Sequence, residues 1–64
     1  MIADDMLAVI RETYPDVRVD RDAHGRTFAV HQGSNFWFGK TRWQAIFAAY
    51  KAVRKSQGKA VFVS

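Results

Sequence analysis

The sequence contains no cysteine and only a single proline. Without cysteine the chain can form neither a disulfide nor a thiolate metal site, so a reducing compartment, the cytoplasm, is expected. No apolar run approaches the roughly 20 residues that a membrane span requires, and Asp4 and Asp5 lie where a signal peptide carries positive charge. These absences predict a soluble cytoplasmic protein without membrane contact.

Carboxylates are also absent from most of the chain. All six lie between Asp4 and Asp22, where three arginines leave a net charge of −3. Residues 23–64 contain no carboxylate and seven lysines and arginines, a net charge of +7. A region whose electrostatic field has one sign attracts ligands of the opposite charge. The distribution of charge therefore predicts a negatively charged partner.

Aromatic and apolar residues are abundant for so short a chain. Five Phe, two Trp and two Tyr occur among 64 residues, of which 48% are hydrophobic. This composition argues against disorder, and a chain of this length has room for one hydrophobic core. We expect a single domain that comprises residues 1–64.

A first helix is predicted at residues 2–13. Its apolar side, at helical spacing, carries Ile2, Met6, Val9, Ile10 and Thr13. Leu7 lies at the margin of this side. Tyr14 precedes Pro15 and is thereby pushed away from helical dihedral angles, so the helix is expected to end there.

Three short strands are expected next. Residues 17–20 and 26–31 alternate between apolar and polar side chains, and the turn residues at positions 22–25 indicate a hairpin between them. A second turn at residues 32–35 leads to a third strand at residues 36–38.

A second helix begins after Thr41. Thr41 and Gln44 have the spacing of a capping box, in which each side chain bonds a free amide of the first turn. The broad apolar face of this helix comprises Trp43, Ile46, Phe47, Ala49, Tyr50 and Val53. Gly58 suits the position just past the helix end, and residues 60–63 are predicted to form a last strand. The predicted fold is α+β, with two helices and an antiparallel sheet of three to four strands.

No pattern in the sequence indicates catalysis. The carboxylates fall on the outer side of the first helix and in the first hairpin, and the serines lack a nucleophile motif. His24 and His31 have no cysteine partner, so no metal site is predicted. Gly39 and Lys40 resemble the end of a phosphate-binding P-loop, but Gly33 is one residue too distant for that motif. We therefore expect no enzyme activity and no cofactor.

Basic residues at and beyond the start of the second helix are the remaining candidates for a binding site. They are Lys40, Arg42, Lys51, Arg54 and Lys55. A helix start also favours anions through its amides and dipole, and such cations contact nucleic-acid phosphates. The alternative interpretation is an ordinary solvated helix face. Trp37 is the aromatic residue predicted to stack on a base or to anchor an interface, because it points away from Phe36 and Phe38.

Two stretches resemble the double-stranded RNA-binding domain family. Residues 24–28 (HGRTF) are similar to the family's loop histidine followed by a strand phenylalanine, and residues 41–53 are similar to its second helix. The resemblance implies recognition of RNA by shape. It also implies that His24 enters a minor groove and that Lys40 and Arg42 bridge phosphates.

In size and predicted architecture the chain also resembles small accessory proteins of phages and prophages, including anti-CRISPR-type inhibitors. The leading hypothesis is a non-catalytic module that binds nucleic acid or a nucleoprotein complex through its basic face. The alternative is a phage-type inhibitor or adaptor that binds an acidic surface of a host protein complex. The salt dependence of the binding affinity distinguishes the two hypotheses. Binding to phosphates weakens steeply as salt rises, whereas an interface anchored by aromatic side chains weakens less. Whether two copies form a homodimer stays open.

Overall fold

The computed structural model describes residues 2–22 and 24–56. Its elements, in chain order, are α1 (Ala3–Thr13), β1 (Arg18–Arg21), β2 (Phe28–Gln32), β3 (Asn35–Gly39) and α2 (Arg42–Ser56). The strands form one antiparallel sheet in the order β1-β2-β3. The predicted α+β fold is confirmed. The strand predicted at residues 60–63 lies outside the described residues.

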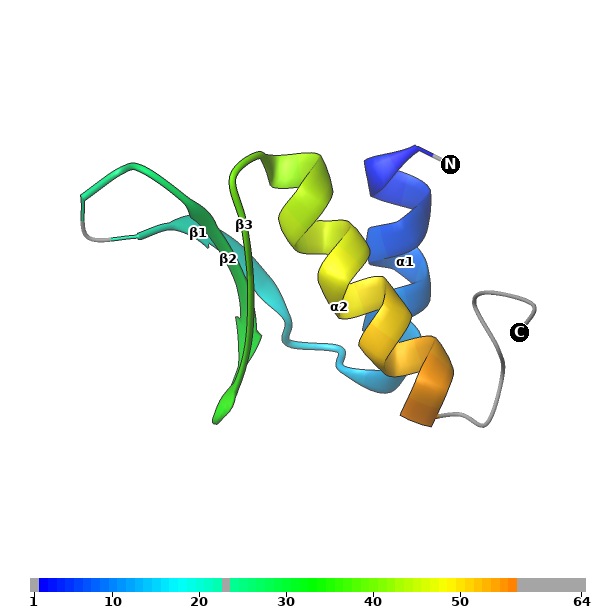
Figure 1. Ribbon diagram of the computed structural model, residues 1–64. Coiled ribbons are helices and arrows are strands. Elements are labelled where there is room, and N and C mark those ends of the chain that lie inside the picture. The colour runs from blue at the N-terminus through cyan, green and yellow to red at the C-terminus, as the bar shows by residue number, and fades with distance from the viewer. Residues whose placement is uncertain (1, 23, 57–64) are drawn as a thin grey trace.

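The helices and the sheet form two layers. Both helices lie on the same side of the sheet, and no described element covers its opposite face (Figure 1). α2 contacts β2, β3 and α1. Neither of the two described helices has the length and apolar character needed to cross a membrane.

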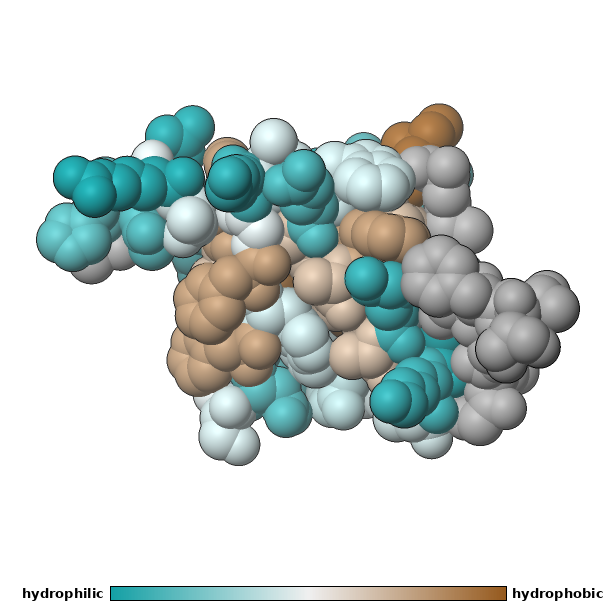
Figure 2. Space-filling view, in the orientation of Figure 1, coloured by the Kyte–Doolittle hydropathy of each residue, from teal (hydrophilic) through white to brown (hydrophobic). Residues whose placement is uncertain are grey.

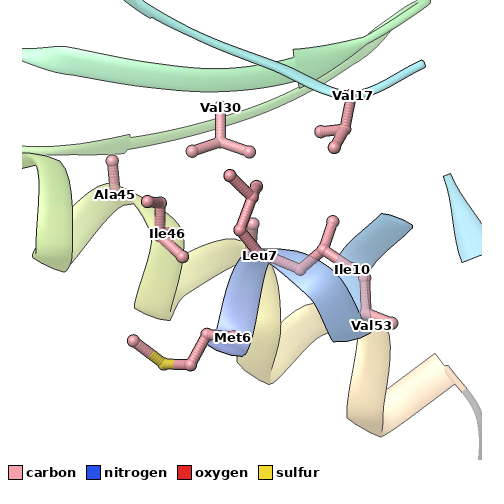
Figure 3. Close-up of a cluster of buried hydrophobic side chains, with 9 residues drawn as sticks. Met6, Leu7, Ile10, Val17, Val30, Ala45, Ile46 and Val53 are labelled. Atoms are coloured by element: carbon pink, nitrogen blue, oxygen red, sulfur yellow. The ribbon is translucent and has the colours of Figure 1, made fainter. Parts of the chain in front are cut away.

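The core lies between the two layers. Figure 3 shows Val17 and Val30 on the sheet side, facing Leu7 and Ile10 of α1 and Ile46 of α2. All five side chains are buried. Burial of such side chains stabilises a fold by roughly 1.5–3 kcal/mol each, so this cluster fixes the positions of all the elements around it.

α1 ends where the sequence predicts, but its buried side is rotated from the predicted one. The Tyr14 amide donates to the Ile10 carbonyl oxygen at 2.8 Å, which closes the last turn. Leu7, predicted at the margin, is buried in the core, whereas Ile2 precedes the helix and is exposed. The difference arises because the sheet, as well as α2, packs against this side of α1.

The turn between β2 and β3 sets which side chains share a face of the sheet. Its first residue, Gly33, has φ of 59°, a value that favours glycine. The resulting register pairs Val30 with Trp37 and Ala29 with Phe38. Because side chains alternate along a strand, Val30 and Trp37 face the helices, and Ala29 and Phe38 lie on the uncovered face.

α2 begins with the predicted cap, in a modified form. The Gln44 amide donates to Thr41 Oγ1 at 3.1 Å. The Gln44 side chain accepts from the amide of Lys40 at 3.2 Å, whereas in the standard capping box it would accept from the amide of Thr41. The cap therefore also holds the backbone of Lys40, one residue before the helix.

The apolar face of α2 is narrower than the sequence indicates. Its buried residues are Ala45, Ile46, Ala49 and Val53. Trp43, at the edge of the predicted face, is 42% exposed and stacks on Phe47 with a centroid distance of 4.9 Å. The sheet and α1 together cover only the central stripe of the helix.

β3 and α2 meet at Gly39 with almost no space between their backbones. A Cβ atom at Gly39 would overlap the backbone nitrogen of Ala45 and lie 2.7 Å from the carbonyl carbon of Gln44. Only glycine permits this approach. The contact holds the start of α2 against the end of the sheet.

Candidate nucleic-acid interface

The β1–β2 loop and the β3–α2 connection lie at the same end of the sheet, called here the hairpin end. The register shows this directly, because Arg21 pairs with Phe28 and Phe28 pairs with Gly39. In Figure 1 this end is at the top, where both helices also begin. The hairpin end carries the cations Arg21, Arg26, Lys40 and Arg42, together with His24.

Asp22 organises the loop that presents His24 and Arg26. Its Oδ1 accepts from the amides of His24 at 3.0 Å and Arg26 at 2.9 Å. Its Oδ2 accepts from the Thr27 hydroxyl at 2.8 Å. These bonds lower the pKa of Asp22 below its ordinary value, with the Thr27 hydroxyl as the largest cause and the Arg26 amide next. The carboxylate is thus turned inward to the loop backbone, and the side chains of His24 and Arg26 are exposed.

The lowered pKa of Asp22 leads to a testable prediction about the loop. A group whose pKa is lower in the folded state stabilises that state above its unfolded pKa, and this stabilisation is lost as the pH falls through the folded value. The amide resonances of His24 and Arg26 are therefore expected to shift together in NMR spectra, with a midpoint below the ordinary Asp pKa of 3.8. The shift is expected to be absent in Asp22→Asn, whose side chain does not titrate. A midpoint above 3.8 would contradict the assignment.

Lys40 and Arg42 flank the cap of α2 and differ in their surroundings. Lys40 is exposed, with its backbone held by Gln44. Arg42 Nη2 lies 3.3 Å from Asp4 Oδ1 at the start of α1. Both partners of this pair are solvent-exposed, so the pair contributes at most about 1 kcal/mol to stability. It does offset the charge of Arg42, which leaves Lys40 as the stronger attraction for an anion.

The other three predicted cations, Lys51, Arg54 and Lys55, lie farther along α2. Lys51 follows Arg42 by nine residues, about 14 Å along the axis and half a turn around it. Lys51 Nζ lies 4.9 Å from the ring centroid of Phe47, and Arg54 Cζ lies 5.9 Å from that of Tyr50. Their side chains thus also cover aromatic surface of the helix. The five predicted cations do not form one cluster.

Trp37 occupies a different environment from the one that its predicted role requires. It faces the helices, is half-buried against the core, and its ring centroid lies 5.8 Å from that of Tyr14. It does point away from Phe36 and Phe38, as predicted, but these two are the exposed aromatic side chains of β3. The structure therefore favours the phenylalanines as the side chains available to a partner.

Arg26, Phe36 and Phe38 are the functional candidates that the sequence analysis did not select. For the two phenylalanines, the signal in the sequence was the two-residue turn at Gly33, which sets the register between β2 and β3. Had its register been assigned, Trp37 would have been placed opposite Val30 and hence on the core face. Nothing local to Arg26 distinguishes it from other loop cations, because its position at the same end of the sheet as Lys40 depends on the pairing of all three strands.

Within residues 2–22 and 24–56, no three His, Asp or Glu side chains are grouped as a metal site would require. His31 Nε2 and Asp20 Oδ2 lie 2.7 Å apart on the uncovered face of the sheet. Comparison with protein-family models, curated proteins and solved structures finds no significant match to this chain.

Proposed function

We propose that this protein is a non-catalytic module that binds nucleic acid by contacting phosphates at the hairpin end. The observation that carries the proposal is that Arg26 and Lys40, two exposed cations from separate connections, lie at the same end of the sheet. Asp22 and Gln44 hold the two backbones. Cations on a pre-ordered backbone lose less conformational freedom when they bind a phosphate than cations on a mobile segment do.

The charge distribution supports a polyanionic ligand at this end. No carboxylate follows Asp22 in the sequence, and Asp22 itself is bonded to loop amides. The start of α1, at the same end, carries Asp4, which pairs with Arg42, and the exposed Asp5. The resemblance to double-stranded RNA-binding domains points to the same two segments, the loop with His24 and the start of α2.

Binding to nucleic acid is tested by fluorescence anisotropy with labelled duplex RNA, duplex DNA and single strands at two salt concentrations. Arg26→Glu and Lys40→Glu are each expected to weaken binding to every ligand by roughly tenfold. Each is also expected to reduce the slope of log affinity against log salt by about 1, because one phosphate contact is lost.

Arg11→Glu is the matched control. Arg11 is exposed in the last turn of α1, at the opposite end of the helices, and its reversal changes the net charge equally. It is expected to change affinity much less than Lys40→Glu. Equal losses in the two variants would mean that net charge alone governs binding and would refute the hairpin-end site.

An inhibitor or adaptor that binds a protein complex is the second candidate function. Trp43 favours it, because a large aromatic side chain that is 42% exposed is a typical anchor of a protein interface. Such a complex would weaken less with salt than a complex with nucleic acid, and Trp43→Ala would weaken it more than Lys40→Glu. Pull-down with each variant as bait separates this function from the first.

A further inference from the structure

The uncovered face of the sheet carries two exposed phenylalanine rings. Phe36 and Phe38 are 53% and 60% exposed, and they alternate along β3 with Trp37, which faces the core. In Figure 2 an apolar area, in brown, lies left of centre on the sheet side of the molecule. Neither ring contributes to the core cluster, so their presence on one face is not explained by folding.

These rings form a row with parallel planes. The ring centroids of Phe36 and Phe38 are 6.2 Å apart with planes 8° from parallel. His31 extends the row, 5.4 Å from Phe36 and 17° from parallel. A centroid spacing of 6.2 Å is nearly twice the rise of about 3.4 Å between bases in a duplex strand. Two bases that each stack on one ring must therefore be spread apart, which an unpaired strand permits without the cost of unstacking a duplex.

The neighbouring strand, β2, places no bulky side chain opposite Phe38. Ala29 is the residue of β2 paired with Phe38, and its side chain is a single methyl group that is itself buried, so it adds no bulk beside the ring. Asp20, on β1, is hydrogen-bonded to His31 through Oδ2. Its carboxylate disfavours a phosphate over the middle of the face, but it does not oppose an uncharged base.

The area of the uncovered face of the sheet also indicates what size of partner it can bind. Three strands about 4.8 Å apart, with about five residues each, present roughly 240 Å². A specific protein interface buries about 800 Å² on each partner. A second copy of the chain that docked on this face alone would bury only about a third of that area, so the face suits an occupant smaller than a protein.

The row of rings leads directly to the hairpin end. Phe38 is followed by Gly39 and Lys40, and Gly39 pairs with Phe28 at the start of β2. A strand with bases on the two rings therefore has its next phosphates beside Lys40 and Arg26. Aromatic rings beside a cationic track are the features by which proteins bind single-stranded nucleic acid.

We infer that Phe36 and Phe38 stack on unpaired bases of a single-stranded nucleic acid whose backbone contacts the hairpin end. The inference rests on the proposed function, since phosphate contact supplies most of the affinity, and it specifies the ligand as single-stranded. Each base contact is expected to contribute roughly tenfold to the affinity.

The test measures anisotropy of a labelled mixed-sequence 12-nucleotide single strand and of the matching 12-base-pair duplex at one salt concentration. The single strand is expected to bind at least tenfold more tightly. Phe36→Leu/Phe38→Leu keeps apolar side chains but removes the ring faces, and a loss of roughly 100-fold for the single strand, with little change for the duplex, is expected. Phe36→Tyr/Phe38→Tyr, which keeps the rings, is expected to retain binding.

Other outcomes separate this inference from the proposed function. Loss of binding in Lys40→Glu with no effect of the leucine substitutions would refute the stacking role and leave the phosphate site. Equal affinity for strand and duplex would also refute it. Phenylalanine-dependent dimerisation in analytical ultracentrifugation would assign the face to a second copy instead. No binding to any nucleic acid would refute both proposals.

Discussion

Gly39→Ala is expected to lower the free energy of unfolding by about 3 kcal/mol, at the upper end of the range for overpacking. A methyl group at Gly39 would overlap the backbone nitrogen of Ala45 and lie 2.8 Å from its Cα atom. Backbone atoms cannot move aside as a side chain can. α2 would have to move away from β3, and this movement would separate buried residues such as Ile46 from Val30.

Urea denaturation followed by circular dichroism measures this loss. Gly33→Ala is the control, because a Cβ there meets no atom within 4 Å although φ is positive; it is expected to cost only about 1–2 kcal/mol. Adding Ala45→Gly to Gly39→Ala is expected to restore nothing, since the overlapping atoms belong to the backbone. An unchanged urea midpoint for Gly39→Ala would show that β3 and α2 are farther apart than the structure places them.

Ile46→Ala is expected to cost about 3 kcal/mol, within the usual range for truncating a buried isoleucine. Ile46 is completely buried between the sheet and α1, and its removal leaves a cavity that the surrounding elements cannot fill. Trp43→Ala, three residues earlier, is expected to cost only about 1 kcal/mol, because the ring, which stacks on Phe47, is partly exposed.

The two variants are compared by the same urea denaturation. The sequence pattern assigns Trp43 and Ile46 to one apolar face, and the larger side chain would then be expected to matter more. The structure predicts the opposite order. Equal losses, or a larger loss for Trp43→Ala, would mean that α2 is rotated about its axis relative to the orientation described here.

Local signals predicted the elements well because each depends on neighbours a few positions away. Thr41 and Gln44 predicted the start of α2, and the structure places Gln44 N on Thr41 Oγ1. Pro15 predicted the end of α1, and the turn around Gly33 predicted the β2–β3 hairpin. Where these signals failed, the error was one of detail, such as the Gln44 side chain bonding Lys40 instead of Thr41.

The candidate site was predictable only in part. His24, Lys40 and Arg42 were selected from the sequence, and the structure brings them to one end of the molecule. Lys51 was selected on the same evidence but leaves α2 on the opposite side from Arg42. A sequence shows which residues are positively charged. Which of these residues lie close together depends on the angle between them around the helix and on the elements packed beside them.

Local sequence patterns were sufficient to predict the order of the described elements, the caps and turns, the separation of acids from bases, and two alternating sets of side chains in β3. Which of these two sets faces water depends on how the elements pack. Phe36 and Phe38 are more apolar than Trp37, so local hydrophobicity alone would bury them. The helices cover the other face, because the two-residue turn aligns Trp37 with Val30, and Val30 is the side chain against which α1 and α2 pack.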